Sequence, residues 1–261
     1  MIDLDRLTFA YPGQMPVFRD FTWHVAPGEM WAVIGPSGCG KSTLLYLLAG
    51  LRQPTAGSLR VAGVEVTRPR ARTGLILQEY GLLPWATVWE NAALGLRLGR
   101  FYAGKQPNDP ARPYPPPDIA PQDVDAWLRR LGIDGLRHAY PSQISGGQRQ
   151  RTAIARTLIL QPDVLLMDEP FSSLDALTRE DLQDLVVELV AETGLTTVLV
   201  THNVEEAAFL GRRILVLGQP PTTRPHVIDN DAAGTPGYRQ QPSYWQKCAE
   251  LRAALASSRL P

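Results

Sequence analysis

Gly35-Pro36-Ser37-Gly38-Cys39-Gly40-Lys41-Ser42-Thr43 is the stretch that decides the fold. It contains the pattern G-x-x-x-x-G-K-S, preceded by an apolar run at 30–34 and followed by a helical pattern at 42–51. Glycines let consecutive backbone N–H groups point at phosphate oxygens, and the following helix adds its positive N-terminal end. We expect Lys41 to reach the β- and γ-phosphates of a nucleotide and the Ser42 hydroxyl to ligate Mg²⁺. The strand-loop-helix context favours this phosphate-binding loop over the alternative, a plain glycine-rich turn.

A second apolar run, at 164–167, ends in two acids, Asp168 and Glu169. A carboxylate at a strand tip beside a phosphate loop can hold Mg²⁺, and we expect this role of Asp168. Glu169 is placed to orient or deprotonate the attacking water. Acidic pairs at strand ends are common, so the pair alone would indicate only a capped turn. Together with the phosphate loop, it predicts a hydrolytic site.

Short apolar runs with β-branched residues alternate with amphipathic runs along the chain. This pattern is typical of an α/β domain with a largely parallel sheet. Residues 1–34 differ, because Pro-Gly turns separate three strand-like pieces, and there we expect an antiparallel β layer that leads into the strand before the phosphate loop. The region 80–162 is predicted to be mainly helical. The predicted strands are 2–9, 17–23, 30–34, 74–77, 164–167, 196–200 and 213–217, and one clear helix is 146–160.

The bulk composition excludes several classes of protein. The 261 residues include 26 Lys and Arg and 26 Asp and Glu, so no polybasic surface for nucleic acid or membrane is indicated. Two cysteines, Cys39 and Cys248, cannot form a disulfide framework, which favours a reducing cytosol. No apolar run approaches the roughly 18 residues of a membrane helix, so we expect a soluble chain.

Two segments depart from the α/β pattern. The span 105–121 is rich in proline, which removes backbone donors and blocks helix formation. It is predicted to be an extended or disordered loop, either a solvated surface segment or a docking segment for a partner. Residues 219–261 are predicted to form a C-terminal tail with a helix at 246–255. The prolines of the loop are Pro107, Pro110, Pro113, Pro115, Pro116, Pro117 and Pro121.

A third motif, Ser145-Gly146-Gly147-Gln148, adds a second candidate phosphate-binding surface. Together with the phosphate loop, it resembles the ATPase subunit of ABC transporters, in which each copy's tetrapeptide closes over the ATP held by the other copy. The resemblance covers about 1–218, with a weaker tail. It implies one ABC ATPase domain over 1–261, a P-loop NTPase fold with an inserted helical subdomain at 80–162, and ATP and Mg²⁺ as cofactors. It also implies a homodimer in which the backbone amides, serine hydroxyl and helix N-terminus of the tetrapeptide bind the γ-phosphate.

Four further positions take their roles from the resemblance. Tyr11 looks like the aromatic residue that stacks on adenine, with a core aromatic as the alternative. Gln78 ends the predicted strand 74–77 and resembles the glutamine that joins the Mg²⁺ site to the helical subdomain. His202, just past 196–200, resembles the switch histidine that contacts the γ-phosphate. Asp175, in Ser172-Ser173-Leu174-Asp175, resembles the key acid of the loop that couples the two sites.

The chain departs from the family pattern at two places. Ile144 precedes the tetrapeptide where the family usually has leucine, a volume-conserving change that should cost little. The proline-rich span 105–121 replaces what is often helix in the inserted subdomain. Neither departure touches the residues expected to bind ATP.

The run Gln78-Glu79-Tyr80-Gly81-Leu82-Leu83-Pro84-Trp85 resembles the nitrate, sulfonate and taurine branch of bacterial importers, as does Pro242-Ser243-Tyr244-Trp245. Leu82, Leu83 and Trp85 are predicted either to line a groove for a cytoplasmic helix of the membrane subunit or to pack inside the helical subdomain. The resemblance implies a subunit that binds and hydrolyses ATP to energise the import of a small solute. It implies transmembrane permease subunits as partners, with an external substrate-binding protein acting through them. The chain is then expected to be cytoplasmic, held at the inner face of the cell membrane by the permease.

The main alternative is a soluble ABC ATPase that works on nucleic acid or ribosomes. Such proteins usually carry two cassettes, a long coiled-coil insert or a strongly basic surface. This chain shows one cassette, no sustained heptads and balanced charge, so we expect no nucleic-acid partner. A binding module with a dead ATPase is a third hypothesis, which the intact acids, tetrapeptide and His202 disfavour. A GTPase is disfavoured because no Asn-Lys-x-Asp motif occurs.

Overall fold

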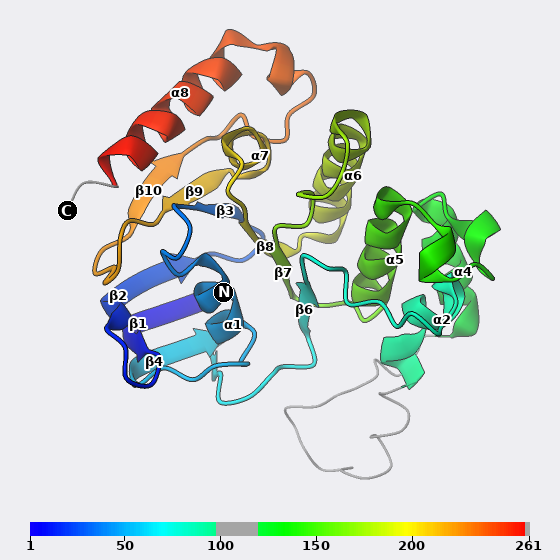
Figure 1. The fold of residues 1–261 in the computed structure, drawn as a ribbon, viewed down its shortest axis with the longest axis horizontal. Coiled ribbons are helices and arrows are strands. Elements are labelled where there is room, and N and C mark those ends of the chain that lie inside the picture. Colours follow the sequence, from blue (N-terminus) through cyan, green and yellow to red (C-terminus); the bar gives the residue numbers. More distant parts are fainter. Residues whose placement is uncertain (98–119, 259–261) are drawn as a thin grey trace. The chain divides into compact units, whose positions relative to one another are not determined.

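The computed structural model describes residues 1–97 and 120–258, which form two compact units (Figure 1). The first unit consists of Met1–Pro69, Leu166–Glu169 and Gln183–Pro261, and the second of Arg70–Leu165 and Pro170–Leu182. Of the proline-rich span 105–121, residues 105–119 lie outside the described residues. Within the described part of the chain, no helix combines the length and the apolar character needed to cross a bilayer.

An antiparallel sheet opens the first unit. Its strands are β1 (Ile2–Ala10), β2 (Pro16–Val25), β4 (Ala56–Val61) and β5 (Val64–Glu65), in the order β2-β1-β4-β5. Apolar residues alternate along β1, and one face of the strand is therefore buried. The predicted antiparallel layer is confirmed, while β4 and β5 were not anticipated.

The second sheet of this unit carries the phosphate loop. Its strands β3 (Met30–Ile34), β7 (Val164–Asp168), β8 (Thr196–Val200), β9 (Arg213–Val216) and β10 (His226–Asp229) stand in the order β10-β9-β3-β8-β7. The strand β3 is parallel to both β8 and β9, and β10 is antiparallel to β9. All residues of β3, β7 and β8 are buried, which explains why apolar residues predominate in them; the polar exceptions are Asp168 at the end of β7 and Thr196 and Thr197 at the start of β8. The predicted mainly parallel core is confirmed.

Three helices of the first unit pack around this sheet. They are α1 (Lys41–Leu48), α7 (Val204–Leu210) and α8 (Pro242–Ser257), with a 3₁₀ turn, η3 (Tyr238–Gln240), before α8. The helix α1 follows the phosphate loop and contacts β8, and α7 contacts both β3 and α8 (Figure 1). The C-terminal half of α6 (Ala176–Thr193) also belongs to this unit. The helix α8 in the tail begins four residues before the predicted helix 246–255 and ends two residues after it.

The second unit is mainly helical. It holds β6 (Thr73–Ile76), α2 (Val88–Ala92), α4 (Pro121–Arg130) and α5 (Gly146–Leu158), with short 3₁₀ turns η1 (Asp134–Leu136) and η2 (Pro141–Gln143). The helix α5 packs against α2, α4 and β6. Reciprocal hydrogen bonds between Thr87 and Glu90 start α2. The buried amide of Asn91 donates to the carbonyls of the preceding turn, and so fixes it.

Candidate functional site

The phosphate loop lies between β3 and α1, as the sequence predicts. Gly40 caps α1 with φ at 107°, a conformation that residues with a side chain rarely adopt. A Cβ atom there would lie 2.4 Å from Val17 Cγ1, and one at Gly35 would lie 2.6 Å from Cys39 Sγ. Glycine is therefore required at both positions by close packing of the loop.

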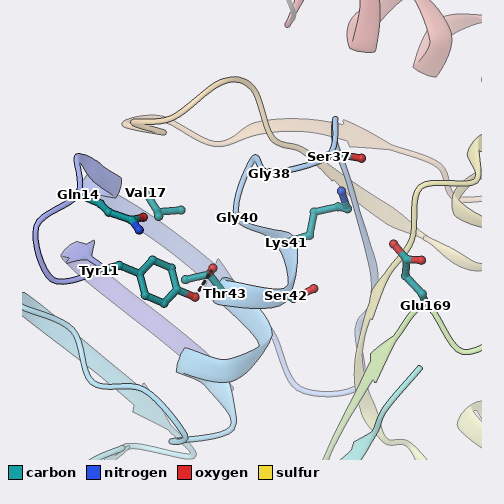
Figure 2. A pocket seen from close by; sticks show the side chains of 10 residues that line it. All are labelled: Tyr11, Gln14, Val17, Ser37, Gly38, Gly40, Lys41, Ser42, Thr43 and Glu169. Carbon is teal, nitrogen blue, oxygen red and sulfur yellow. Dashed lines mark hydrogen bonds between the residues drawn. The ribbon is translucent and has the colours of Figure 1, made fainter. Parts of the chain in front are cut away.

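This loop forms one wall of an open pocket of about 410 Å³. Figure 2 shows Tyr11 at one end of the pocket and Glu169 at the other, with Lys41 and Ser42 between them. Gln14 and Val17, which the sequence did not single out, complete the wall near Tyr11. The lining residues are Tyr11, Gln14, Val17, Ser37, Gly38, Gly40, Lys41, Ser42, Thr43 and Glu169.

Lys41 supplies a nearly buried positive charge to this pocket. Its Nζ donates to the carbonyl oxygens of Gly35 at 2.9 Å and Pro36 at 3.0 Å. The first turn of α1 contains no acidic residue, so the positive N-terminal end of the helix is not offset there. The loop, the helix end and the lysine together make a binding site for an anion.

Ser42 and Asp168 place two oxygen atoms side by side next to the loop. The Ser42 hydroxyl donates to Asp168 Oδ1 at 3.2 Å. Burial raises the pKa of Asp168 above its ordinary range; the hydrogen bond from Ser42 opposes this shift, the charge of Glu169 adds to it, and Lys41 opposes it. A hydroxyl and a carboxylate are ligands that Mg²⁺ accepts, since it prefers oxygen and is usually held by one or two carboxylates plus substrate phosphates. The donor set therefore fits Mg²⁺.

Glu169 and His202 meet at the ends of β7 and β8. Glu169 Oε2 lies 3.0 Å from His202 Nδ1, and the Glu169 N–H donates to the Val200 carbonyl at 2.9 Å. Glu169 has φ at 46°, an unusual value for a residue other than glycine. Such strain, about 1–3 kcal/mol, persists where the surroundings fix the backbone and is concentrated at functional sites. The strained turn aims the carboxylate into the pocket.

Tyr11 lies in the pocket wall rather than in the core. Its hydroxyl is 3.1 Å from Thr43 Oγ1, and its ring packs edge-on against Phe9 with centroids 5.0 Å apart. The Arg52 guanidinium lies 5.6 Å from the ring centroid. Phe9 and Phe18 are buried, whereas Tyr11 is half-exposed beside the phosphate loop. This position suits a surface on which a nucleotide base stacks.

In the second unit, Ser145-Gly146-Gly147-Gln148 begins α5. The Ser145 hydroxyl accepts from the Gln148 N–H, and the Gln148 side chain accepts from the Ser145 N–H. A Cβ atom at Gly147 would lie 2.4 Å from Thr178 Cγ2, so glycine is required there too. No acid occupies the first turn of α5. The tetrapeptide therefore presents a capped helix N-terminus that can attract an anion.

Gln78 and Asp175 also belong to the second unit. Gln78 is exposed just past the end of β6. Asp175 precedes α6 and accepts from the Thr178 N–H at 3.1 Å, which lowers the pKa of its carboxyl group. The structure thus brings the phosphate loop, Tyr11, Asp168, Glu169 and His202 together in the first unit. The second unit holds the other predicted site residues, which are the tetrapeptide, Gln78 and Asp175.

Sequence reasoning missed the contacts of Tyr80, two residues after Gln78. Its hydroxyl lies 2.5 Å from Ser173 Oγ, and Arg156 donates to the carbonyls of Tyr80 at 2.7 Å and Gly81 at 2.6 Å. The Arg149 guanidinium lies 5.8 Å from the Tyr80 ring centroid. Arg149 and Arg156 are two turns apart on one face of α5, and that spacing was the available signal.

Trp85 is more exposed than Leu82 and Leu83, the other two residues for which the sequence left both a groove and a core position open. The Trp85 side chain is 74% exposed, so it is not part of the core. Leu82 and Leu83 are half-buried.

Comparison with known proteins now identifies the family. The family model described as ABC transporter matches residues 18–172. The chain belongs to the ABC transporter family. The fold is that of an ABC ATPase cassette, and the chain binds and hydrolyses ATP.

Three relatives show how far the similarity extends. The taurine import ATP-binding protein TauB of Pelagibacter ubique is 41% identical over 203 residues, covering 78% of this chain and 71% of that protein. TauB of Escherichia coli K12 is 40% identical over 221 residues, covering 85% and 81%. The aliphatic sulfonates import ATP-binding protein SsuB of Bacillus cereus is 38% identical over 218 residues, covering 84% and 80%. These relatives give no support to the nucleic-acid alternative.

Solved structures agree with the family assignment. The dimeric post-hydrolysis state of the ATP-binding cassette MJ0796, bound to ADP and Pi, aligns with a TM-score of 0.71 at 26% identity, covering 88% of this chain and 98% of that one. A second dimeric structure of MJ0796 aligns with a TM-score of 0.70 at 28% identity over the same shares.

Proposed function

We propose that this ABC ATPase hydrolyses Mg·ATP to energise the import of a sulfonate, taurine or a similar small solute through a membrane permease. The proposal rests on the pocket, which is lined by Tyr11, Lys41, Ser42 and Glu169. From Tyr11 to Glu169, these side chains follow the order of a nucleoside triphosphate from its base to its γ-phosphate. Identities of 38% to 41% to taurine and aliphatic sulfonate import proteins support the solute class.

The first unit binds the nucleotide. Tyr11 stacks on the adenine, the loop N–H groups of 35–43 surround the phosphates, and Lys41 neutralises the β- and γ-phosphates. Ser42 and Asp168 would hold Mg²⁺, and we propose Gln78 as a further ligand. When bound, Mg²⁺ neutralises the charge that develops on the phosphates.

Glu169 acts as the catalytic base. Its carboxylate is fixed by a strained backbone turn and orients or deprotonates the water that attacks the γ-phosphate. His202 contacts the γ-phosphate and, through its 3.0 Å contact with Glu169, keeps that carboxylate oriented. A base needs this fixed geometry to reach the attacking water.

The complete site needs a second copy of the chain. We propose that two copies close head to tail, so that Ser145, Gly146, Gly147 and Gln148 of one copy bind the γ-phosphate held by the loop of the other. The helix N-terminus at Ser145 offers N–H groups and a positive end to that phosphate. Asp175 couples the two sites. Dimeric structures of a similar cassette support this arrangement.

Closure of this dimer moves the permease. The chain is one ABC ATPase domain, 1–261, in which the helical subdomain 80–162 transmits motion, and the tail is 219–261. Trp85, exposed with half-buried Leu82 and Leu83 beside it in sequence, is available to contact a cytoplasmic helix of the permease. This contact holds the chain at the cytoplasmic face of the membrane, and an external substrate-binding protein delivers the solute to the permease.

Glu169→Gln tests the proposed chemistry. Glutamine keeps the shape of the side chain but cannot accept the proton, so turnover should fall by on the order of 10²–10⁴ while ATP binding is kept. The variant should accumulate as an ATP-bound dimer in size-exclusion chromatography. Glu65→Gln, at an exposed position of β5, is the matched control and should behave as wild type. Undiminished turnover in Glu169→Gln would remove Glu169 from the role of base.

Reconstitution tests the transport role. The chain should co-purify with a membrane permease and should support ATP-dependent uptake of taurine or an alkanesulfonate into vesicles that hold the permease and its binding protein. Co-purification with nucleic acid instead, without permease, would contradict the proposal.

A further inference from the structure

The helix α7 is too short to be stable by itself. It has only seven residues, Val204–Leu210, and begins directly after the candidate switch residue His202 and the cap residue Asn203. Isolated helices shorter than about 12–15 residues are marginal in water. The placement of α7 therefore depends on the elements it packs against, which include β3 and α8.

The C-terminal tail satisfies the carbonyl groups at the end of α7. Asn230 is only 4% exposed, and its Nδ2 donates to the carbonyls of Ala208 at 2.7 Å and Gly211 at 3.1 Å. Tyr238 in turn donates its hydroxyl to Asn230 Oδ1 at 2.7 Å, which orients the amide. Carbonyls in the last turn of a helix lack partners within the helix. One buried side chain of the tail thus terminates α7.

The tail also contacts the last turn and the first turn of α7. At Phe209, the Gly234 N–H donates to the backbone carbonyl at 2.8 Å, and the Arg239 guanidinium lies 3.3 Å from the ring centroid. At Glu205, in the first turn, the backbone carbonyl accepts from the Tyr244 hydroxyl at 3.3 Å. The Glu205 carboxylate accepts from Arg252 at 2.5 Å. The tail therefore contacts both ends of α7.

The start of α7 in turn fixes the backbone on both sides of His202. The Thr201 hydroxyl donates to the buried carboxylate of Glu206 at 2.6 Å and accepts from the Asn203 N–H at 3.0 Å. Asn203 caps α7 by accepting from the N–H groups of Glu205 and Glu206. The Thr201 N–H donates to Val33 of β3 at 3.1 Å. A displacement of α7 would therefore move His202 relative to β3 and to Glu169.

We propose that the C-terminal tail, through Asn230 and Tyr238, is a positioning element for ATP hydrolysis. It fixes α7 and thereby holds His202 against Glu169. Asn230 and Tyr238 are positioning residues, since the Asn230 side chain bonds the end of α7 and Tyr238, and neither residue lines the pocket. The inference rests on the proposed role of His202. Because Tyr11 and Lys41 lie on other elements, loosening the tail should lower turnover and leave nucleotide binding intact.

Four variants of the full chain test this proposal. Tyr238→Phe removes one hydroxyl, and Asn230→Ala removes the amide. Each should lower kcat, by about 10-fold for Asn230→Ala, with the KM for ATP within about twofold of wild type, since misplacement of a catalytic group by 1 Å can cost about 100-fold. The third variant, His202→Ala, provides the background for the first two. Lys247→Ala is the matched control, because Lys247 bonds Asp229 and Glu250 of the tail region and not α7, and it should keep the wild-type kcat.

The decisive measurement is the kcat of the double variants. If the tail acts through His202, adding Tyr238→Phe or Asn230→Ala to His202→Ala should cause no further loss of kcat, measured per ATP-binding site by titration. An equal fold loss in the wild-type and His202→Ala backgrounds would overturn the proposal, because a general loss of folded protein is independent of His202. Tyr238→Phe keeps the test valid if Asn230→Ala does not fold. Wild-type turnover of His202→Ala itself would instead refute the proposed role of His202.

Discussion

Replacement of Lys41 by methionine removes the positive charge of the pocket and keeps most of the side-chain volume. In the free protein, the lysine Nζ donates to the carbonyls of Gly35 and Pro36. On ATP binding it must exchange these bonds for two charge-assisted hydrogen bonds to the phosphates, worth about 1.5–3 kcal/mol each. Loss of the two hydrogen bonds to the neutral carbonyls of Gly35 and Pro36 offsets this gain by about 1 kcal/mol each. The net contribution is about 1–4 kcal/mol, or a factor of about 5 to 10³ in the Kd for ATP.

Isothermal titration of ATP at fixed Mg²⁺ measures this change. Lys247→Met is the matched control, since Lys247 also donates to a backbone carbonyl, that of Asp229, but lies on α8. It should bind ATP like the wild type. A Kd for Lys41→Met within twofold of the wild-type value would refute the assignment of the phosphate loop.

Two other substitutions test Asp168, which bonds the pocket residue Ser42, and the pocket residue Gly40. Asp168→Asn should abolish ATP hydrolysis and yet raise the melting temperature at neutral pH. Burial raises the pKa of Asp168, so the native state loses stability as pH rises through that pKa and the charge forms; the gain should vanish below the ordinary carboxyl pKa of about 3.9. An unchanged or lower melting temperature at neutral pH would contradict this. Gly40→Ala should lose ATP binding and cost about 1–3 kcal/mol of unfolding free energy in urea, because its Cβ would lie 2.4 Å from Val17 Cγ1 at a φ of 107°; wild-type stability would show that the loop can relax.

Segments whose structure depends on local sequence were predicted well. The strands Met30–Ile34 and Thr196–Val200 have the predicted bounds, because each is a short run rich in apolar and β-branched residues that is buried on both faces. The strand β10 (His226–Asp229) was missed, because only Val227 and Ile228 are apolar and the segment becomes a strand by pairing with β9. Likewise, β5 has only two residues and owes its assignment to its neighbour β4.

The same distinction between local and non-local structure applies to the candidate site. The phosphate loop and the Asp168-Glu169 pair are contiguous in sequence, so their chemistry was readable from residue types and spacing. The left-handed backbone at Glu169 and its contact with His202 depend on how β7 and β8 end side by side, which no local pattern encodes. The burial of Asn230 against α7 is equally non-local.

The central claim is that each ATP site is built from two copies of the chain. Two mixed dimers, isolated with two affinity tags, test it by ATP turnover. If the tetrapeptide acts on the other copy's nucleotide, a dimer of Lys41→Ala with Ser145→Arg retains one intact site and its ATPase activity. A dimer of wild type with the double variant Lys41→Ala/Ser145→Arg then retains none. The opposite pattern, with activity only in the second dimer, would place loop and tetrapeptide of one chain at the same ATP and contradict the account.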